Sequence, residues 1–337
     1  MKHREVLLRT KEGEWVKALA PVILSVSRST DIPAFYADWF FNRLQEGYFV
    51  WYNPYNRHKS YISFEAVRLI VFFSKNPVPL LPWLDFLEEE GIHCYLHFTL
   101  NDYEKEALEP HLDVLEKRIQ SFRSLSARLG KERIIWRYDP LFLTDQLDVD
   151  DLLKRAEYIG NQLNEYTRKM VFSYADIARY RHVSARLLRS GIAFREFSEP
   201  EMIEWAAGLQ SLNRSWGYEL ATCAEAIHLE SYGIVPNKCI DDGLIRRIFP
   251  EDKQLMKVIG GGQQPSGLFG DFTPAISGTA LRDKGQRPLC YCIPAQSVGE
   301  YNTCPHLCKY CYANRHPDKV MENYRHHLEN PTAESLI

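Results

Sequence analysis

The feature of this chain that most constrains its fold is a repeated alternation of strand-like and helix-like segments. Short runs rich in β-branched and aromatic residues predict seven buried strands, at residues 22–27, 68–74, 94–100, 133–139, 169–174, 217–223 and 289–293. Amphipathic helical patterns lie between many of them, beginning at residues 33, 102, 148 and 199. Two further runs that flank residues 54–59 predict a hairpin beside the main sheet.

This alternation predicts an α/β protein with a parallel sheet. Seven strands favour a closed or nearly closed (β/α) barrel of the TIM type, and a doubly wound open sheet is the alternative. The chain has 337 residues, of which 45% are hydrophobic and 25% charged, enough for a sizeable core. We expect a single barrel domain over residues 1–337, with residues 282–330 forming a cysteine-bearing loop and helix within it.

Composition narrows the possible partners and location. The N-terminal apolar run at residues 18–26 contains Pro21 and is too short to span a bilayer, and we expect no signal peptide at this end. We therefore expect a cytoplasmic protein with no membrane partner. The net charge of −3 argues against a global nucleic-acid footprint, although a local basic groove would still allow nucleic acid to bind.

Polar side chains recur where the expected strands end. Arg28, Lys75, Arg137 and Asp139 all stand at such ends. In α/β proteins, ligands bind at the carboxyl ends of parallel strands, so these four are candidate ligand-binding residues. Polar strand ends are also expected wherever strands meet solvent. Asp31 is expected to cap the first helix.

Three cysteines are packed into a short stretch near the C-terminus. Cys304, Cys308 and Cys311 have the spacing C-x3-C-x2-C. In a reducing compartment, clustered thiols more often bind metal than form disulfides, and thiolates suit zinc or iron–sulfur clusters. A structural zinc would need a fourth ligand, for which His306 and His316 are candidates.

A second set of cysteines precedes this stretch. Cys290 and Cys292 are two residues apart and would point to the same face of a strand. Cys223 ends a strand expected to lie nearby, and Cys239 follows it. These four predict a second site holding zinc or an auxiliary iron–sulfur cluster. The alternative is buried free cysteines that pack as small hydrophobes, which is what we expect of Cys94.

The string "CPHLCKYCYAN", with Tyr310 as its aromatic residue, resembles the cluster motif of radical S-adenosylmethionine (SAM) enzymes, especially spore photoproduct lyase-like proteins. The resemblance implies a 4Fe–4S cluster on three cysteines, with one iron open to SAM. It further implies SAM cleavage that starts radical chemistry on an unknown substrate, and an electron donor such as flavodoxin or ferredoxin. The expected SAM- and substrate-binding residues are Arg28, Lys75, Arg137, Asp139 and Tyr310. No catalytic residue is identified.

In that superfamily the motif usually follows the first barrel strand, whereas here it follows the last expected strand, residues 289–293. The resemblance therefore implies a circularly permuted barrel. Longer strings resemble a bacterial domain-of-unknown-function family, DUF1848: "SRSTDIPAFYADWF", "FFSKNP", "WRYDP", "CAEAIHLESYGIVPNKCID", "QRPLCYC" and "YNTCPHLCKYCYAN". That likeness implies one integrated barrel with iron–sulfur content and supplies no substrate.

Two functions thus follow from the sequence. The first is a radical SAM-like enzyme with a second metal site. The alternative is a non-catalytic zinc or iron–sulfur module that binds nucleic acid or a protein partner. A fourth protein ligand on the C-terminal site would favour the alternative.

Overall fold

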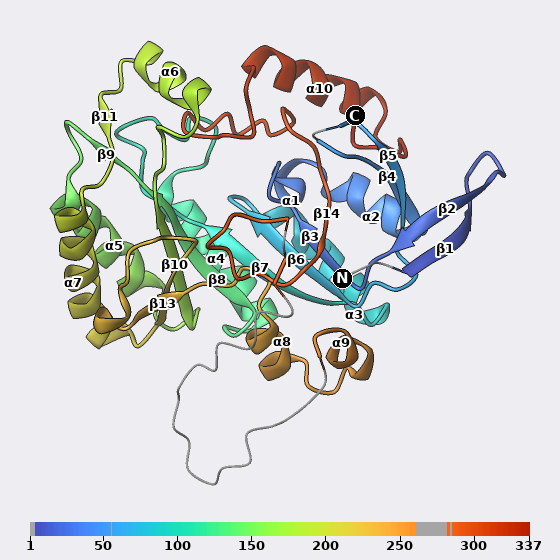
Figure 1. Ribbon diagram of the computed structural model, residues 1–337, viewed down its shortest axis with the longest axis horizontal. Coiled ribbons are helices and arrows are strands. Elements are labelled where there is room, and N and C mark those ends of the chain that lie inside the picture. The colour runs from blue at the N-terminus through green and yellow to red at the C-terminus, as the bar shows by residue number, and fades with distance from the viewer. Residues whose placement is uncertain (1–3, 55, 261–281, 284) are drawn as a thin grey trace, which may run out of the picture.

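The computed structural model describes residues 4–54, 56–260, 282–283 and 285–337. Its centre is an eight-stranded sheet in which every recorded pairing is parallel (Figure 1). The strands are β3 (Ile23–Val26), β6 (Leu69–Ser74), β7 (His93–Thr99), β8 (Ile134–Leu141), β10 (Lys169–Tyr174), β12 (Glu219–Thr222), β13 (Ile234–Pro236) and β14 (Gln296–Ser297). The parallel α/β prediction is confirmed, as are six of the seven expected strands.

The seventh expected strand, residues 289–293, is wrong. This segment runs in irregular structure along the loop after β13, where the backbone N–H of Ile293 donates to the carbonyl of Ile240. The N–H of Cys239 also donates to Cys292 Sγ. These contacts replace strand pairing. The sheet instead gains the shorter β14, which lies parallel to β3.

The strand order bears on the two expected topologies, the closed barrel and the doubly wound open sheet. It runs β13-β12-β10-β8-β7-β6-β3-β14, so the chain moves steadily in one direction from β3 to β13. A doubly wound sheet reverses direction at a switch point; the strands from β3 to β13 show no such reversal, but the last strand, β14, returns to lie on the other side of β3. Among the described residues no pairing joins β13 to β14, so closure of the barrel is not seen.

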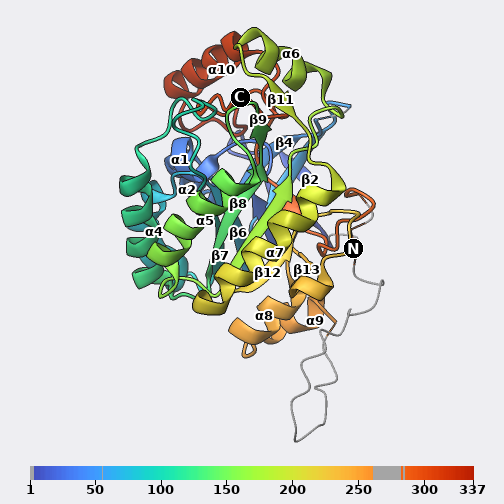
Figure 2. The ribbon, with the colours of Figure 1, turned by 90° about the vertical axis from the view of Figure 1, so that its left-hand side faces the viewer.

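The two faces of the sheet carry different layers. One face packs against α2 (Ala37–Gln45), α3 (Leu84–Glu89), α4 (Leu115–Leu129), α5 (Val149–Leu163) and α7 (Glu199–Trp216). Figure 2 shows α4, α5 and α7 along this side. The other face packs against α8 (Asp242–Ile248), α9 (Lys253–Val258) and the irregular cysteine-bearing segments. Strand side chains alternate between the two layers, as the period of a strand requires.

Local capping explains where several helices begin. Asp31 caps α1 (Ile32–Phe35) by accepting from the N–H of Ala34 at 3.1 Å, as expected from the sequence. Asp148 and Asp151 form a capping box at the start of α5. The remaining helical segments are η1 (Val78–Trp83), η2 (Glu230–Tyr232), α6 (Arg181–Arg189) and α10 (Pro317–Glu329).

A smaller sheet flanks the main one. It has the order β1-β2-β5-β4, with β1 (Arg4–Arg9), β2 (Trp15–Ala20), β4 (Tyr48–Tyr52) and β5 (Lys59–Ser63). The expected hairpin of β4 and β5 is confirmed as an antiparallel pair. A short pair, β9 (Leu143–Thr144) and β11 (Phe194–Arg195), completes the strands. Within the described residues, no helix combines the length and apolar character needed to cross a bilayer.

Candidate metal centres and the network around them

The C-terminal cysteine loop is delivered to the sheet by β14. Gln296 pairs with Leu24 of β3, and the N–H of Val298 donates to the carbonyl of Ser25 at 3.0 Å. Because parallel strands end at the same edge, the loop that follows β14 emerges beside the loops that follow β3 and β6. Cys304 and Cys311 in that loop are partly exposed, and Cys308 is buried.

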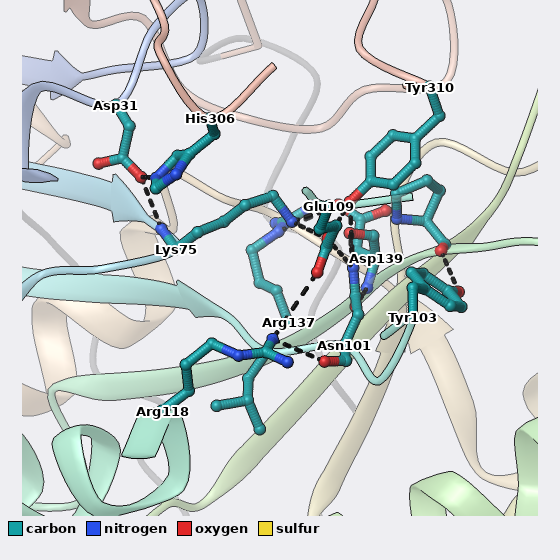
Figure 3. A network of polar contacts seen from close by, with 12 residues as sticks. Asp31, Lys75, Asn101, Tyr103, Glu109, Arg118, Arg137, Asp139, His306 and Tyr310 are labelled. Atoms are coloured by element: carbon teal, nitrogen blue, oxygen red, sulfur yellow. Dashed lines mark hydrogen bonds and ion pairs between the residues drawn. The ribbon is translucent and has the colours of Figure 1, made fainter. Parts of the chain in front are cut away.

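A buried carboxylate, Asp31, joins these three loops (Figure 3). Its oxygens accept from Ser74 Oγ at 2.7 Å and from the N–H of Lys75 at 2.7 Å, both at the end of β6. His306, between the first two cysteines of the loop, places Nε2 2.9 Å from Asp31 Oδ2. Burial alone would raise the pKa of Asp31, but His306 and these donors hold that pKa below its usual value.

A second buried junction lies at Lys75. Its Nζ is 2.5 Å from Glu109 Oε1 and 2.9 Å from the hydroxyl of Tyr310, the aromatic residue of the cysteine motif. The Tyr310 hydroxyl also donates to Glu109, and Asn101 donates to Glu109 at 3.0 Å. Arg118 Nη1 stands 3.7 Å from the other Glu109 oxygen. The Tyr310 side chain therefore anchors the cysteine loop in a buried ionic network (Figure 3).

Two thiols of the C-terminal loop, those of Cys304 and Cys308, have raised pKa values. Burial raises the pKa of Cys304 well above its usual value, and the Asp31 carboxylate and then the neighbouring Cys308 and Cys311 raise it further. Burial likewise raises the pKa of Cys308, while the Lys75 ammonium opposes this shift. Metal binding would have to displace the thiol protons, since the thiolate is the ligand.

The second cysteine set comes together on the face of the sheet that packs against α8 and α9. Cys223 directly follows β12, Cys239 lies in the loop after β13, and both are buried with Cys290 and Cys292 in one cluster. Cys223 Sγ and Cys239 Sγ are 3.7 Å apart. The N–H of Cys239 donates to Cys292 Sγ at 3.1 Å. The structure thus brings together the four thiols that the sequence grouped.

Hydrogen bonds within this set favour the thiolate at Cys239 and Cys290 and the thiol at Cys223 and Cys292, whose pKa values they raise. Cys239 Sγ accepts from Arg137 Nη1 at 3.1 Å and from Asn237 Nδ2 at 3.4 Å. Hydrogen bonds from the thiols of Cys223 and Cys292 hold the pKa of Cys239 well below its usual value. The pKa of Cys290 falls to about 6, chiefly because the Cys292 thiol donates to it. Donors to metal-bound sulfur stabilise and tune thiolate sites.

The spacing of these thiols can be compared with that of a metal site. Tetrahedral zinc with Zn–S bonds of about 2.3 Å places neighbouring sulfurs about 3.8 Å apart. Cys223 and Cys239 match this at 3.7 Å. Nevertheless, among the described residues no three His, Cys, Asp or Glu side chains are arranged to hold a single ion. The donor chemistry and one sulfur pair fit zinc or an iron–sulfur cluster, whereas the full geometry of an ion site is not assembled.

A chain of hydrogen bonds connects the two cysteine sets. Asn101, which also bonds Tyr310 at 3.3 Å, accepts from the N–H of Asp139 at 2.9 Å and donates to its carbonyl at 3.1 Å. The Asp139 carboxylate lies 2.5 Å from Arg137 Nη2. Arg137 in turn donates to Cys239 Sγ. The predicted site residues Arg137, which is buried, and Asp139, which is partly exposed, thus form an ion pair beside the second set.

Arg28 also faces the second cysteine set. Burial would lower its pKa, but the thiols, with Cys292 and Cys239 foremost, raise it. Its guanidinium carbon lies 5.9 Å from the centre of the Phe73 ring. Of the five predicted ligand-binding residues, Lys75 and Tyr310 therefore lie at the first set, and Arg28, Arg137 and Asp139 lie beside the second.

The two histidines considered as a fourth metal ligand differ. His316 is exposed and directly precedes α10, where its N–H lies 3.4 Å from Asn302 Oδ1. His306 is buried, and its Nδ1 finds no hydrogen-bond partner among the described residues. Of the two, only His306 is held inside the network around the cysteine loop.

Several residues of the network were not predicted from the sequence. Glu109 lies in a segment expected to be helical, where a glutamate usually faces solvent; in the structure α4 begins only at Leu115. Asn101 directly follows the expected strand at residues 94–100, so the polar strand-end signal could have found it. Arg186, whose guanidinium contacts the Cys311 carbonyl, lies on α6, a helix that the sequence analysis did not find. No signal in a single sequence marks Glu109, Arg118 or Arg186.

Comparison with known proteins gives a family and no activity. A family model described as "Domain of unknown function (DUF1848)" matches residues 23–313. None of the curated proteins compared with the chain matches it. A crystal structure of a candidate alpha-L-fucosidase from Bacteroides thetaiotaomicron VPI-5482 matches 78% of this chain and 83% of its own at 11% identity, with a TM-score of 0.27. That likeness is too slight to carry an argument.

Proposed function

Because this chain belongs to the DUF1848 family, whose description names no activity, we propose a function from the chain's own residues. We propose a radical SAM-like iron–sulfur enzyme of unknown substrate. Cys304, Cys308 and Cys311 would hold a 4Fe–4S cluster. A second zinc or iron–sulfur centre would be held by Cys223, Cys239, Cys290 and Cys292.

One observation carries the proposal. The C-x3-C-x2-C loop follows β14, which lies beside β3. The loop therefore emerges at the carboxyl edge of the sheet, next to the end of β3. Ligands of parallel α/β sheets bind at this edge. We further propose that β14 followed by β3 to β13 is a circularly permuted radical SAM barrel. A bound 4Fe–4S cluster with one iron free of protein ligands would bind SAM and supply the electron that cleaves it.

The chain's own residues would prepare this site in two ways. Lys75, Glu109 and Tyr310 hold the cysteine loop against the sheet. Arg28 and Arg137 place positive charge beside the second set, which would balance its thiolates. An acidic redox protein such as flavodoxin or ferredoxin would supply electrons.

One contact supports the alternative of a non-catalytic metal module. A metal-bound histidine typically donates its other ring nitrogen to a carboxylate. His306 Nε2 bonds Asp31, and its Nδ1 has no partner among the described residues. Rotation of the loop that turned Nδ1 toward the thiols would complete a Cys3His zinc site, closing the position that SAM requires.

Metal and sulfide analysis of anaerobically purified protein separates these functions. The enzyme proposal expects brown protein with iron and sulfide, and conversion of SAM to 5′-deoxyadenosine and methionine after reduction. Cys308→Ala should abolish that conversion, while the matched variant Cys94→Ala, in a buried cysteine outside both sets, should not. Colourless anaerobic protein containing only zinc, with zinc lost in His306→Ala, would refute the enzyme and support the alternative.

A further inference from the structure

One arginine from outside the cysteine loop contacts four of the loop's backbone carbonyl groups. Arg186 Nη1 lies 3.3 Å from the carbonyl oxygen of Cys308, 3.4 Å from that of Lys309 and 3.1 Å from that of Cys311. Its Nη2 donates to the carbonyl of Asn314. The guanidinium therefore spans the last two cysteines and the turn that follows them.

The same face of α6 makes further contacts with this loop. His182 Nε2 lies 3.0 Å from the carbonyl oxygen of Tyr312. Residues four apart share one face of a helix, so His182 and Arg186 face the loop together. Tyr180, just before the helix, stacks on the Tyr312 ring with centroids 5.3 Å apart. Arg189 on the same helix is exposed.

Backbone chemistry explains why the loop needs this partner. The described residues between β14 and α10 form no regular helix or strand, so many of their carbonyls lack the backbone N–H partner that a helix or sheet would provide. A guanidinium offers five N–H donors in a rigid fork, whereas an ammonium offers three from a single point. Arg186, which is half-buried, also places a positive charge next to Cys308 and Cys311.

We propose that Arg186 is a positioning residue for the first metal centre, and that α6 clamps the cysteine loop from outside the sheet. Arg186 fixes the backbone on either side of Cys308 and Cys311, so that both thiols stay in ligating position. Its charge makes the bound centre easier to reduce. The inference rests on the proposed function in that the loop binds metal, but its clamping part does not depend on which metal is bound.

The test compares Arg186→Met and Arg186→Lys with Arg189→Met, a matched arginine on the same helix. Hydrogen exchange of backbone N–H groups in residues 304–314 is measured on the protein as purified. Arg186→Met should speed exchange there about tenfold or more, while β6 and β7 exchange at the unchanged rate. Arg189→Met should behave as the parent. Equal exchange in the two methionine variants would overturn the clamp.

Metal release and potential test the effect on the centre. Loss of metal to a chelator should be several-fold faster in Arg186→Met and Arg186→Lys, because neither side chain has the forked set of N–H donors of a guanidinium. The midpoint potential of the first centre, followed by electron paramagnetic resonance, should fall in Arg186→Met and be largely kept in Arg186→Lys. Unchanged release rates would overturn the positioning role even if exchange increased.

The test also separates this inference from the proposed function. If the parent holds zinc in place of iron, the enzyme proposal fails, and slower zinc release from the parent than from Arg186→Met still supports the clamp. If the parent loop holds no metal, the positioning role is overturned. Far-UV circular dichroism and retention of metal at the second centre exclude general unfolding as the cause.

Discussion

Glu109 sits at the centre of the buried junction, so replacing Glu109 by Gln gives a sharp test of its importance. The side chains of Glu109 and Lys75 are 4% and 15% exposed, with 2.5 Å between Oε1 and Nζ. Glu109→Gln keeps the shape but leaves the Lys75 ammonium buried without its counter-ion. Removing one partner of a buried ion pair costs about 3–5 kcal/mol. Arg118 would still keep Glu104 and the Asn101 carbonyl as partners.

Urea unfolding, followed by both tryptophan fluorescence and circular dichroism, measures this cost. The matched control is Asp113→Asn, which removes the exposed partner of Lys117 at 2.9 Å. That pair should contribute only about 0.2–1 kcal/mol. Because Lys75→Met removes the stranded charge, the double variant Lys75→Met/Glu109→Gln should be less destabilised than the two single changes added together, by about 0.5–3 kcal/mol. A Glu109→Gln cost no larger than that of the control, or strict additivity in the double variant, would refute the reasoning.

Three further predictions test other parts of the structure. Cys239→Ser should remove metal from the second centre and leave the first, with Cys94→Ser as the control; elemental analysis showing equal metal in both variants would contradict a second centre. Gly299→Ala should destabilise the protein by about 1–3 kcal/mol in thermal unfolding, because Gly299 has φ +97° and an added Cβ would lie 2.8 Å from Ser27 Oγ; an unchanged melting temperature would be inconsistent with the β14–β3 junction. The free energy of unfolding should fall as the pH is lowered below about 6.5. Burial lowers the pKa of His93, so on acidification the unfolded chain takes up this proton before the folded chain does. At lower pH Asp252 adds to the loss, because the Leu255 N–H and Arg68 hold the pKa of its carboxyl below the usual value despite burial. His93→Gln should reduce the first part of that slope without abolishing it, because burial also lowers the pKa values of His97, His182 and His327; an identical profile would argue against the contribution of His93.

The sequence predicted the buried strands well because their hydrophobic runs are continuous and bounded by polar ends. It failed where pairing is short or polar. β14 is only Gln296–Ser297, and β13 contains a proline, so neither has a strand signature. Residues 289–293 carry such a signature, but their contacts with residues 239 and 240 prevail over it.

The cysteine sets could be grouped from spacing because metal-binding residues come in recognisable patterns. Their supporting residues could not. Asp31 was expected only as a helix cap, a role it does fill, yet its other contacts come from β6 and from His306. Glu109 and Arg186 act through partners about 35 to 200 residues away in sequence. Such contacts depend on tertiary structure, which local periodicity does not encode.

The pairing of β14 with β3 also bears on how the chain is made. The two strands are about 270 residues apart in sequence. At a translation rate of about 5–20 residues per second, β14 is therefore synthesised roughly 14–54 s after β3 and can pair with it only then. Throughout that interval β3 is an unprotected edge, and an open edge invites pairing with other chains. The yield of folded protein should therefore depend on the speed of translation and on chaperones that shield this edge, even in cells with ample supplies of metal.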